Sequence, residues 1–206
     1  MIFVFDLDDT VCETDLYSEK YIANFIKKHN LPYKFVEKCT RFAEAKFDWD
    51  EATALKWYKT YGDQMMLEFP AKEGAIETIN ALFDAGHTII IATARATDWH
   101  TNPIEITYEW LKKNGVKYSK IYTGRVDKEA ICLDENADFF IDDDLKITTR
   151  VALTSHIKTS FNEKGCQSLI MTTAYNKNLE LPAGVIRIND FKHFRKFLKE
   201  NGVILN

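Results

Sequence analysis

Ile-Phe-Val-Phe-Asp-Leu-Asp-Asp-Thr, residues 2–10, opens the sequence after its first methionine. The first four of these residues, Ile2 to Phe5, are wholly apolar and run directly into acids. A short apolar run of this kind is typical of a central strand in a parallel sheet, because helices cover both faces of such a strand. It is far too short for the core of a signal peptide, and it lacks a positive flank. We therefore expect residues 2–5 to form a buried strand.

Four more apolar runs follow, and each predicts a further strand: Thr88–Ala92, Phe139–Ile141, Ser168–Met171 and Val185–Ile188. Helical patterns lie between them. We expect helices over Glu73–Ala85, from Asn102 to Gly115, and from Asn189 to near Gly202. At the start of the second helix, Asn102, Pro103 and Glu105 form a capping-box-like arrangement. This alternation predicts an α/β fold, a doubly wound parallel sheet, in which ligands bind at the carboxyl ends of the strands.

Residues 14–69 interrupt the alternation. Their periodicity is helical over Leu16–His29, Tyr33–Lys46 and Asp50–Leu67, and they contain no convincing strand. We therefore expect a small helical insertion between the first strand and the rest of the sheet. Its aromatic residues should mostly form the core of the insertion, with one or two facing a cleft; they are Phe42, Phe47, Trp49, Trp57, Tyr58, Tyr61 and Phe69.

The composition indicates one globular domain, or one domain with a lid, because 206 residues with 28% charged residues lie in the ordinary globular range. The net charge of -4 offers no basic surplus, which argues against a nucleic-acid polymer as partner but leaves a small anionic ligand possible. No apolar run approaches the ~20 residues of a membrane span, so we expect no membrane association. The cysteines are scattered without a Cys-x-x-Cys pair, which favours reduced and mostly buried thiols in a cytoplasmic protein; they are Cys12, Cys39, Cys132 and Cys166.

Two carboxylates, Asp6 and Asp8, stand where the first strand leaves the sheet. Alternation along an extended segment sends their side chains the same way, so both can approach one ligand. Together with Asp9 they repel one another, which suggests a compensating cation. The alternative structural interpretation is an acidic turn that caps the following helix.

Polar groups also follow two other predicted strands. Thr93, Ala94 and Arg95 come after the second, where a hydroxyl and backbone N–H groups can hold phosphate oxygens. Asp142, Asp143 and Asp144 follow the strand at 139–141, and a parallel sheet brings this cluster to the same edge as Asp6, which predicts an oxygen-rich magnesium site. Lys128 precedes Asp142 by 14 residues and could neutralise both phosphate and nucleophile. Each of these features alone also fits an ordinary strand end, a surface turn or a solvated lysine.

Four features follow one another along the sequence: Asp6-x-Asp8-x-Thr10, Thr93, Lys128 and the Asp142-Asp143 pair. In their order and spacing they resemble the four motifs of the haloacid dehalogenase superfamily, over about 140 residues. The resemblance implies that Asp6 is the nucleophile and Asp8 the general acid and base. It makes Thr93, Ala94 and Lys128 the phosphate binders. Mg²⁺ would be held by the side chains of Asp6 and Asp142 and by the backbone carbonyl of Asp8. Asp143 would lie behind these ligands or reach the ion through water.

The resemblance also divides the chain, with residues 1–13 and 70–206 as the core and residues 14–69 as a helical C1-type cap. Within the superfamily, the sequence looks most like the 5′(3′)-deoxyribonucleotidase-like group. The supporting residues are the Thr93-Ala94-Arg95 turn, Glu109-Trp110-Leu111, Phe140-Ile141-Asp142-Asp143, Thr173-Ala174-Tyr175-Asn176 and Val185-Ile186-Arg187, although Ala174 stands where relatives often carry proline.

The expected activity is therefore magnesium-dependent hydrolysis of a phosphate monoester of a small metabolite, a nucleoside monophosphate first. Base stacking on the aromatic residues of the cap would fit that substrate. The alternatives are a sugar-phosphate or other metabolite phosphatase, a phosphomutase, a polynucleotide-end phosphatase, which the charge disfavours, and a non-catalytic binding protein on the same scaffold. Arg95 is a possible substrate contact, whereas Trp99 and His100 fit a packed loop better and Cys12 fits a packed thiol.

Overall fold

The computed structural model describes residues 1–31, 47, 49–158 and 165–205. Within them lies one sheet of six parallel strands, in the order β3-β2-β1-β4-β5-β6. The strands are β1 (Ile2–Phe5), β2 (Thr88–Thr93), β3 (Lys120–Thr123), β4 (Phe139–Asp142), β5 (Gln167–Met171) and β6 (Val185–Ile188). The doubly wound α/β prediction is confirmed. The edge strand β3 was not predicted, because its half-exposed residues form no apolar run.

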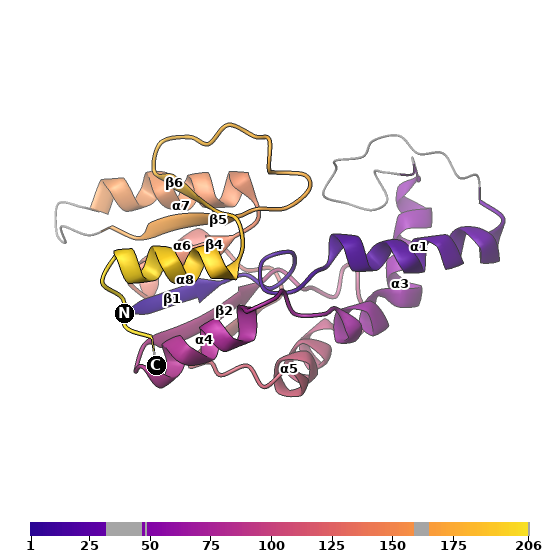
Figure 1. Cartoon of the computed structure of the whole chain (residues 1–206). Coiled ribbons are helices and arrows are strands. Elements are labelled where there is room, and N and C mark those ends of the chain that lie inside the picture. Colours follow the sequence, from indigo (N-terminus) through magenta and orange to yellow (C-terminus); the bar gives the residue numbers. More distant parts are fainter. Residues whose placement is uncertain (32–46, 48, 159–164, 206) are drawn as a thin grey trace.

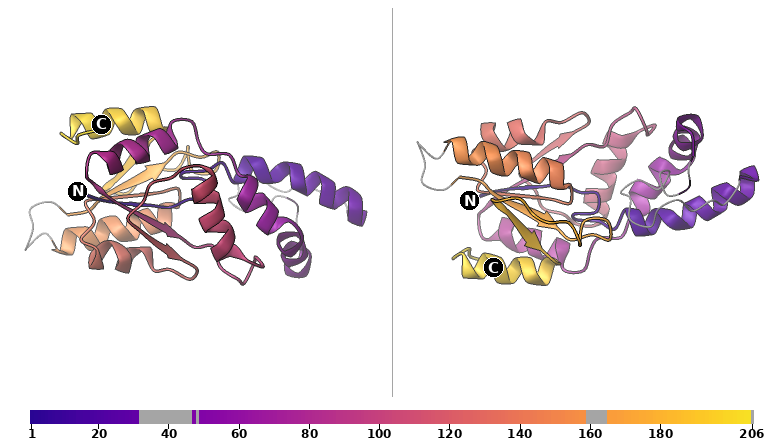
Figure 2. Two further views of the ribbon diagram at one scale, coloured as in Figure 1. Left: turned by 90° about the horizontal axis from the view of Figure 1, so that it is seen from below. Right: turned by 90° about the horizontal axis from the view of Figure 1, so that it is seen from above.

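Helices cover both faces of the sheet (Figure 2). They are α4 (Ala75–Asp84), α5 (Pro103–Lys113), α6 (Lys128–Asp134), α7 (Leu145–Lys158) and α8 (Phe191–Glu200). Side chains alternate along β1, so Phe3 and Phe5 join one core cluster and Val4 joins another. The first cluster takes side chains from α4, α5 and α8, and the second takes them from α6 and α7. Burial on both faces explains why β1 reads as a continuous apolar run.

Two further helices, α1 (Asp15–His29) and α3 (Glu51–Glu68), lie beyond the carboxyl ends of the strands (Figure 1). The expected helix Tyr33–Lys46 lies outside the described residues. Of the aromatic residues that were expected to form the core of the insertion, Phe47, Trp57 and Phe69 are buried. They belong to the cluster that also contains Phe3 and Phe5, so this segment shares one core with the sheet. Among the described helices, none has both the length and the apolar character needed to cross a membrane.

One local prediction was wrong. Asn102 stands at the start of α5, but its side chain makes no capping hydrogen bond there. Its backbone and side-chain N–H groups donate instead to the carboxylate of Asp63 in α3. A tertiary contact has therefore replaced the local capping box.

Candidate active site

The first strand, the fourth strand and helix α6 bring three charged side chains together. Asp6 follows β1, Asp142 ends β4, and Lys128 is the first residue of α6. Lys128 Nζ lies 2.7 Å from Asp6 Oδ1 and 2.6 Å from Asp142 Oδ2, and all three side chains are buried. The strand order turns in opposite directions on either side of the β1–β4 pair, and such a switch point is where open α/β sheets bind ligands. The expected meeting of Asp6 with Asp142 is thus present.

The charged groups of this cluster shift one another's pKa values. Burial raises the pKa of Asp6 well above its usual value; the positive charge of Lys128 opposes this and the neighbouring acids add to it. Burial by itself would lower the pKa of Lys128, but the charges of Asp142 and Asp6 raise it above its ordinary value. Lys128 therefore stays a cation between two carboxylates.

Asp143 is the third acid of this cluster. Its carboxylate accepts hydrogen bonds from Thr10 Oγ1, at 3.2 Å, and from the hydroxyl of Tyr175. Asn176 Nδ2 donates to the backbone oxygen of Asp143 at 2.9 Å, which holds the same loop. Asp144 instead accepts from backbone N–H groups in the first turn of α7. The segment around Tyr175, quoted above only for its resemblance, thus reaches the site.

The three acids fit an oxygen-liganded divalent cation. One carboxylate oxygen each from Asp6, Asp142 and Asp143 lies within 4.8 Å of the other two, and all three residues are buried. Hard cations such as Mg²⁺ prefer carboxylate oxygens. One lysine against three acids leaves room for further positive charge.

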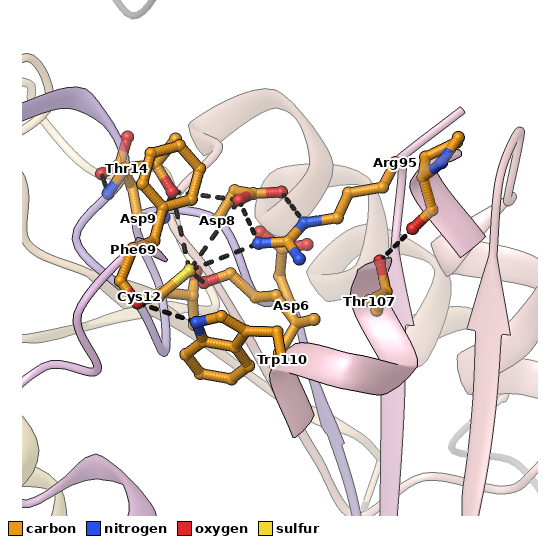
Figure 3. A network of polar contacts seen from close by, with 12 residues as sticks. Asp6, Asp8, Asp9, Cys12, Thr14, Phe69, Arg95, Thr107 and Trp110 are labelled. Carbon is orange, nitrogen blue, oxygen red and sulfur yellow. Dashed lines mark hydrogen bonds and ion pairs between the residues drawn. The ribbon is translucent and has the colours of Figure 1, made fainter. Parts of the chain in front are cut away.

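Asp8 is held by an arginine, which was not foreseen (Figure 3). Arg95 Nε and Nη2 donate to the two oxygens of Asp8 at 2.9 and 2.8 Å, and Thr14 Oγ1 donates to Asp8 Oδ1 at 3.0 Å. Burial would raise the pKa of Asp8, but the charge and hydrogen bonds of Arg95, with that of Thr14, lower it to about 2. Asp8 is therefore ionised at neutral pH. Arg95 is only 3% exposed, and its Nη1 has no hydrogen-bond partner among the described residues.

Asp9 fits the alternative interpretation of the acidic turn. Its carboxylate accepts from the backbone N–H groups of Thr14 and Asp15, both at 2.9 Å, at the start of α1. Burial, with the negative charges of Asp143 and Asp15, raises the pKa of Asp9 to about 7. Asp9 thus organises the loop.

Thr93 and Ala94 lie at the end of β2, as expected. Thr93 is fully buried, and within the part of the chain that the structure describes its Oγ1 has no hydrogen-bond partner. An orphaned hydroxyl beside a candidate anion site is consistent with a ligand oxygen as its missing partner. Ala94 and Arg95 line the adjoining cavity.

A cavity of about 220 Å³ adjoins these residues. Its wall combines polar groups of the sheet edge with apolar side chains of α3 and its flanks; among them are Asp6, Asp8, Arg95, Lys128, Asp143, Trp57, Tyr58, Met65, Met66 and Phe69. His100 also lines it, whereas the sequence favoured a packed loop for His100. Trp99 is 41% exposed and is not part of this wall. Cys12 is buried, and burial raises the pKa of its thiol, as expected of a packed cysteine.

Neither a protein-family model nor a curated protein matches the sequence. Solved structures do match its fold. A haloacid dehalogenase-like hydrolase from Streptococcus pneumoniae superposes with a TM-score of 0.63 at 13% identity, covering 95% of this chain and 97% of that one. A predicted phosphatase from Clostridium acetobutylicum gives 0.63 at 19% identity, covering 97% and 98%.

A D,D-heptose 1,7-bisphosphate phosphatase from B. bronchiseptica, complexed with magnesium and phosphate, gives a TM-score of 0.54 at 13% identity, covering 97% of this chain and 98% of that one. Sequence identities this low support a shared fold and no more than that. The six-stranded order, the acids at its switch point and these matches together lead to one conclusion: the chain has the fold of haloacid dehalogenase-like hydrolases.

Proposed function

We propose that this protein is a magnesium-dependent phosphomonoester hydrolase in which Asp6 is the nucleophile. The observation that carries the proposal is the buried cluster of Asp6, Lys128 and Asp142 at the switch point of the sheet. A phosphate dianion repels an incoming carboxylate, so a site for this reaction needs fixed positive charge. Lys128 supplies one such charge, and the neighbouring acids supply a place for a second.

In the first step, a carboxylate oxygen of Asp6 attacks phosphorus and the bond to the leaving alcohol breaks. Lys128 contacts Asp6 Oδ1, while Oδ2 has no hydrogen bond among the described residues, so Oδ2 is the oxygen available for attack. The leaving oxygen takes a proton from Asp8 as it departs. The product is an aspartyl-phosphate on Asp6 and a free alcohol.

In the second step, water attacks the phosphorus, the bond between phosphorus and Asp6 breaks, and inorganic phosphate leaves. Asp8, which lost its proton in the first step, takes a proton from the attacking water. The ionised form of Asp8 that Arg95 maintains suits this base role. For the first step Asp8 must hold a proton. An arriving phosphate dianion shares Arg95 and repels the Asp8 carboxylate, and both effects raise the pKa of Asp8.

Asp6, Asp142 and Asp143, with the backbone carbonyl of Asp8, are the groups that would hold Mg²⁺. When bound, Mg²⁺ offsets negative charge on the phosphoryl oxygens. Thr93 and the backbone at Ala94 would hold those oxygens, and Thr93 Oγ1, which has no hydrogen-bond partner among the described residues, would gain one. Residues 14–69 would act as the cap that closes the site.

Nucleoside monophosphates are the substrate class we place first. Trp57, Tyr58 and Phe69 line the cavity beside the proposed nucleophile, and aromatic walls suit a planar base. A sugar phosphate is the second candidate. The volume of about 220 Å³ is small against ordinary ligand pockets of about 300–1,000 Å³, which favours a compact leaving group.

The test is hydrolysis of a panel of phosphate monoesters by purified protein, with and without chelator. We expect turnover that chelator abolishes and Mg²⁺ restores, and no turnover by an Asp6→Asn variant with an unchanged circular dichroism spectrum. Activity of that variant equal to wild type would overturn the proposal. Failure of the wild-type protein to hydrolyse any ester, together with binding of one, would favour a non-catalytic binding protein.

A further inference from the structure

Gly62 stands inside helix α3, where glycine is a poorer helix former than alanine. Its backbone is not in the left-handed region that favours glycine. A Cβ at this position would lie 2.3 Å from Nδ1 of His100 and 3.0 Å from Cε1. Real side chains essentially never approach this closely. The missing side chain therefore makes room for the imidazole of His100.

The same face of α3 holds the backbone around His100. Lys59, Gly62 and Asp63 are three and four residues apart, so they share one helix face. Lys59 Nζ donates to the carbonyl oxygen of His100 at 2.7 Å. Asp63 Oδ2 accepts from the backbone N–H of Asn102 at 3.1 Å. Helix α3 thus fixes both the ring of His100 and the loop that carries it.

The contact with Gly62 also indicates which ring nitrogen carries the proton. Nδ1 is buried and, among the described residues, has no hydrogen-bond partner. The Cα–H bond of Gly62 that stands in place of a Cβ points toward Nδ1, so a lone pair fits there and an N–H would clash. The proton of the neutral ring then belongs on Nε2.

The far side of the imidazole, opposite Nδ1, carries Nε2. His100 lines the cavity that Asp8 and Arg95 also line. Because Nδ1, Cε1 and Cγ are the ring atoms nearest Gly62, the edge with Nε2 is the one left to face a ligand in that cavity. Burial lowers the pKa of His100; Asp8 and Asp63 oppose this, and Arg95 and Lys59 add to it. The balance favours a neutral ring with one N–H donor.

We propose that His100 is a specificity-determining residue, whose Nε2–H donates a hydrogen bond to a hydroxyl or carbonyl oxygen in the leaving group of the substrate. The proposal rests on the proposed hydrolase function, and it adds the chemistry by which the leaving group is recognised. Helix α3 positions the donor, and Gly62 is the residue that allows the position.

The experiment compares esters that differ in their leaving group. Uridine 5′-monophosphate and ribose 5-phosphate carry acceptor oxygens in the leaving group, whereas phenyl phosphate carries none. For His100→Ala, we expect kcat/KM to fall about tenfold on whichever of the first two the wild type hydrolyses, and less than about twofold on phenyl phosphate. An equal loss on both kinds of ester, or no loss, would overturn the proposal. If the wild-type protein hydrolyses none of the three esters, both the role of His100 and the choice of these esters as substrates are overturned.

Gly62→Ala provides a matched second variant, because alanine is otherwise favourable in a helix. Its added methyl group should displace the ring and reproduce the selective loss of His100→Ala. In a His100→Ala background the same change should have no further effect on kcat/KM. Additive losses would contradict the assigned contact.

A measurement on the wild-type protein without substrate tests the tautomer separately. In ¹⁵N-correlated NMR spectra of the histidine side chains, His100 should show a protonated Nε2 and an unprotonated Nδ1 near neutral pH. A protonated Nδ1 would remove the donor and refute the proposal, even if phosphate esters are hydrolysed.

Discussion

Replacing Lys128 by methionine removes a cation that lies between two buried carboxylates, those of Asp6 and Asp142. Lys128 Nζ is 2.7 Å from Asp6 Oδ1 and 2.6 Å from Asp142 Oδ2, and its side chain is 3% exposed. Methionine keeps a similar length and apolar stem, so packing changes little. The variant therefore isolates the loss of the charge.

The expected cost is about 3–5 kcal/mol of the free energy of unfolding, the cost of leaving a buried charge without its partner. The loss should be larger at pH 8 than at pH 6. As pH rises, Asp6 and Asp142 ionise without a cation beside them, and the folded state loses stability relative to the unfolded state. Mg²⁺ should restore more stability to the variant than it adds to wild type, because a bound cation replaces part of the missing charge.

Urea unfolding followed by tryptophan fluorescence, in chelator and then in Mg²⁺, measures these differences. Lys196→Met is the matched control, since the Lys196 side chain is 73% exposed and should change stability by about 0.5 kcal/mol or less. A loss for Lys128→Met no greater than that of the control would refute the account of the charge cluster. So would a loss that shrinks as pH rises.

Three further variants test the surroundings of this cluster in metal-free protein. Asp9→Asn should stabilise the fold at pH 8, by up to about 4 kcal/mol, and have little effect near pH 4. Folding raises the pKa of Asp9 to about 7, so the wild-type protein loses stability as pH rises through that range and the variant does not. Equal stability of variant and wild type at both pH values in thermal unfolding would contradict the assignment. Arg95→Gln should raise the pKa of Asp8 from about 2 to its ordinary range or above, as followed by ¹³C NMR titration, and a pKa that stays near 2 would contradict the role of Arg95. Tyr175→Phe should weaken Mg²⁺ or Mn²⁺ binding about 10- to 100-fold in calorimetry, because Asp143 loses a hydrogen bond that orients its carboxylate. Unchanged metal affinity would exclude a role of Tyr175 in orienting Asp143.

The sequence was sufficient to predict five of the six strands and the meeting of the acids that follow them. Apolar runs such as Ile2–Phe5 mark buried parallel strands, and parallel strands bring the residues after their carboxyl ends to one edge. Asp6 and Asp142 could therefore be placed together across 136 residues without coordinates. The edge strand Lys120–Thr123 escaped because a half-exposed strand has no continuous apolar pattern.

Contacts between distant segments could not be predicted in the same way. The pairing of Arg95 with Asp8 depends on which side of the β2 turn faces the β1 loop. The approach of His100 to Gly62 depends on where α3 packs against the loop before α5. A glycine inside an otherwise helical pattern was the one signal available for this contact, since such a glycine often reflects a close approach.

The central claim is that Asp6 forms a covalent bond to phosphorus during turnover. Rapid acid quenching of the wild-type protein with a ³²P-labelled ester and Mg²⁺, followed by peptide mapping, measures this directly. We predict a hydroxylamine-sensitive label on the peptide that contains Asp6, formed and lost at rates compatible with turnover. Full turnover with no labelled protein, or a label on another residue, would contradict the mechanism.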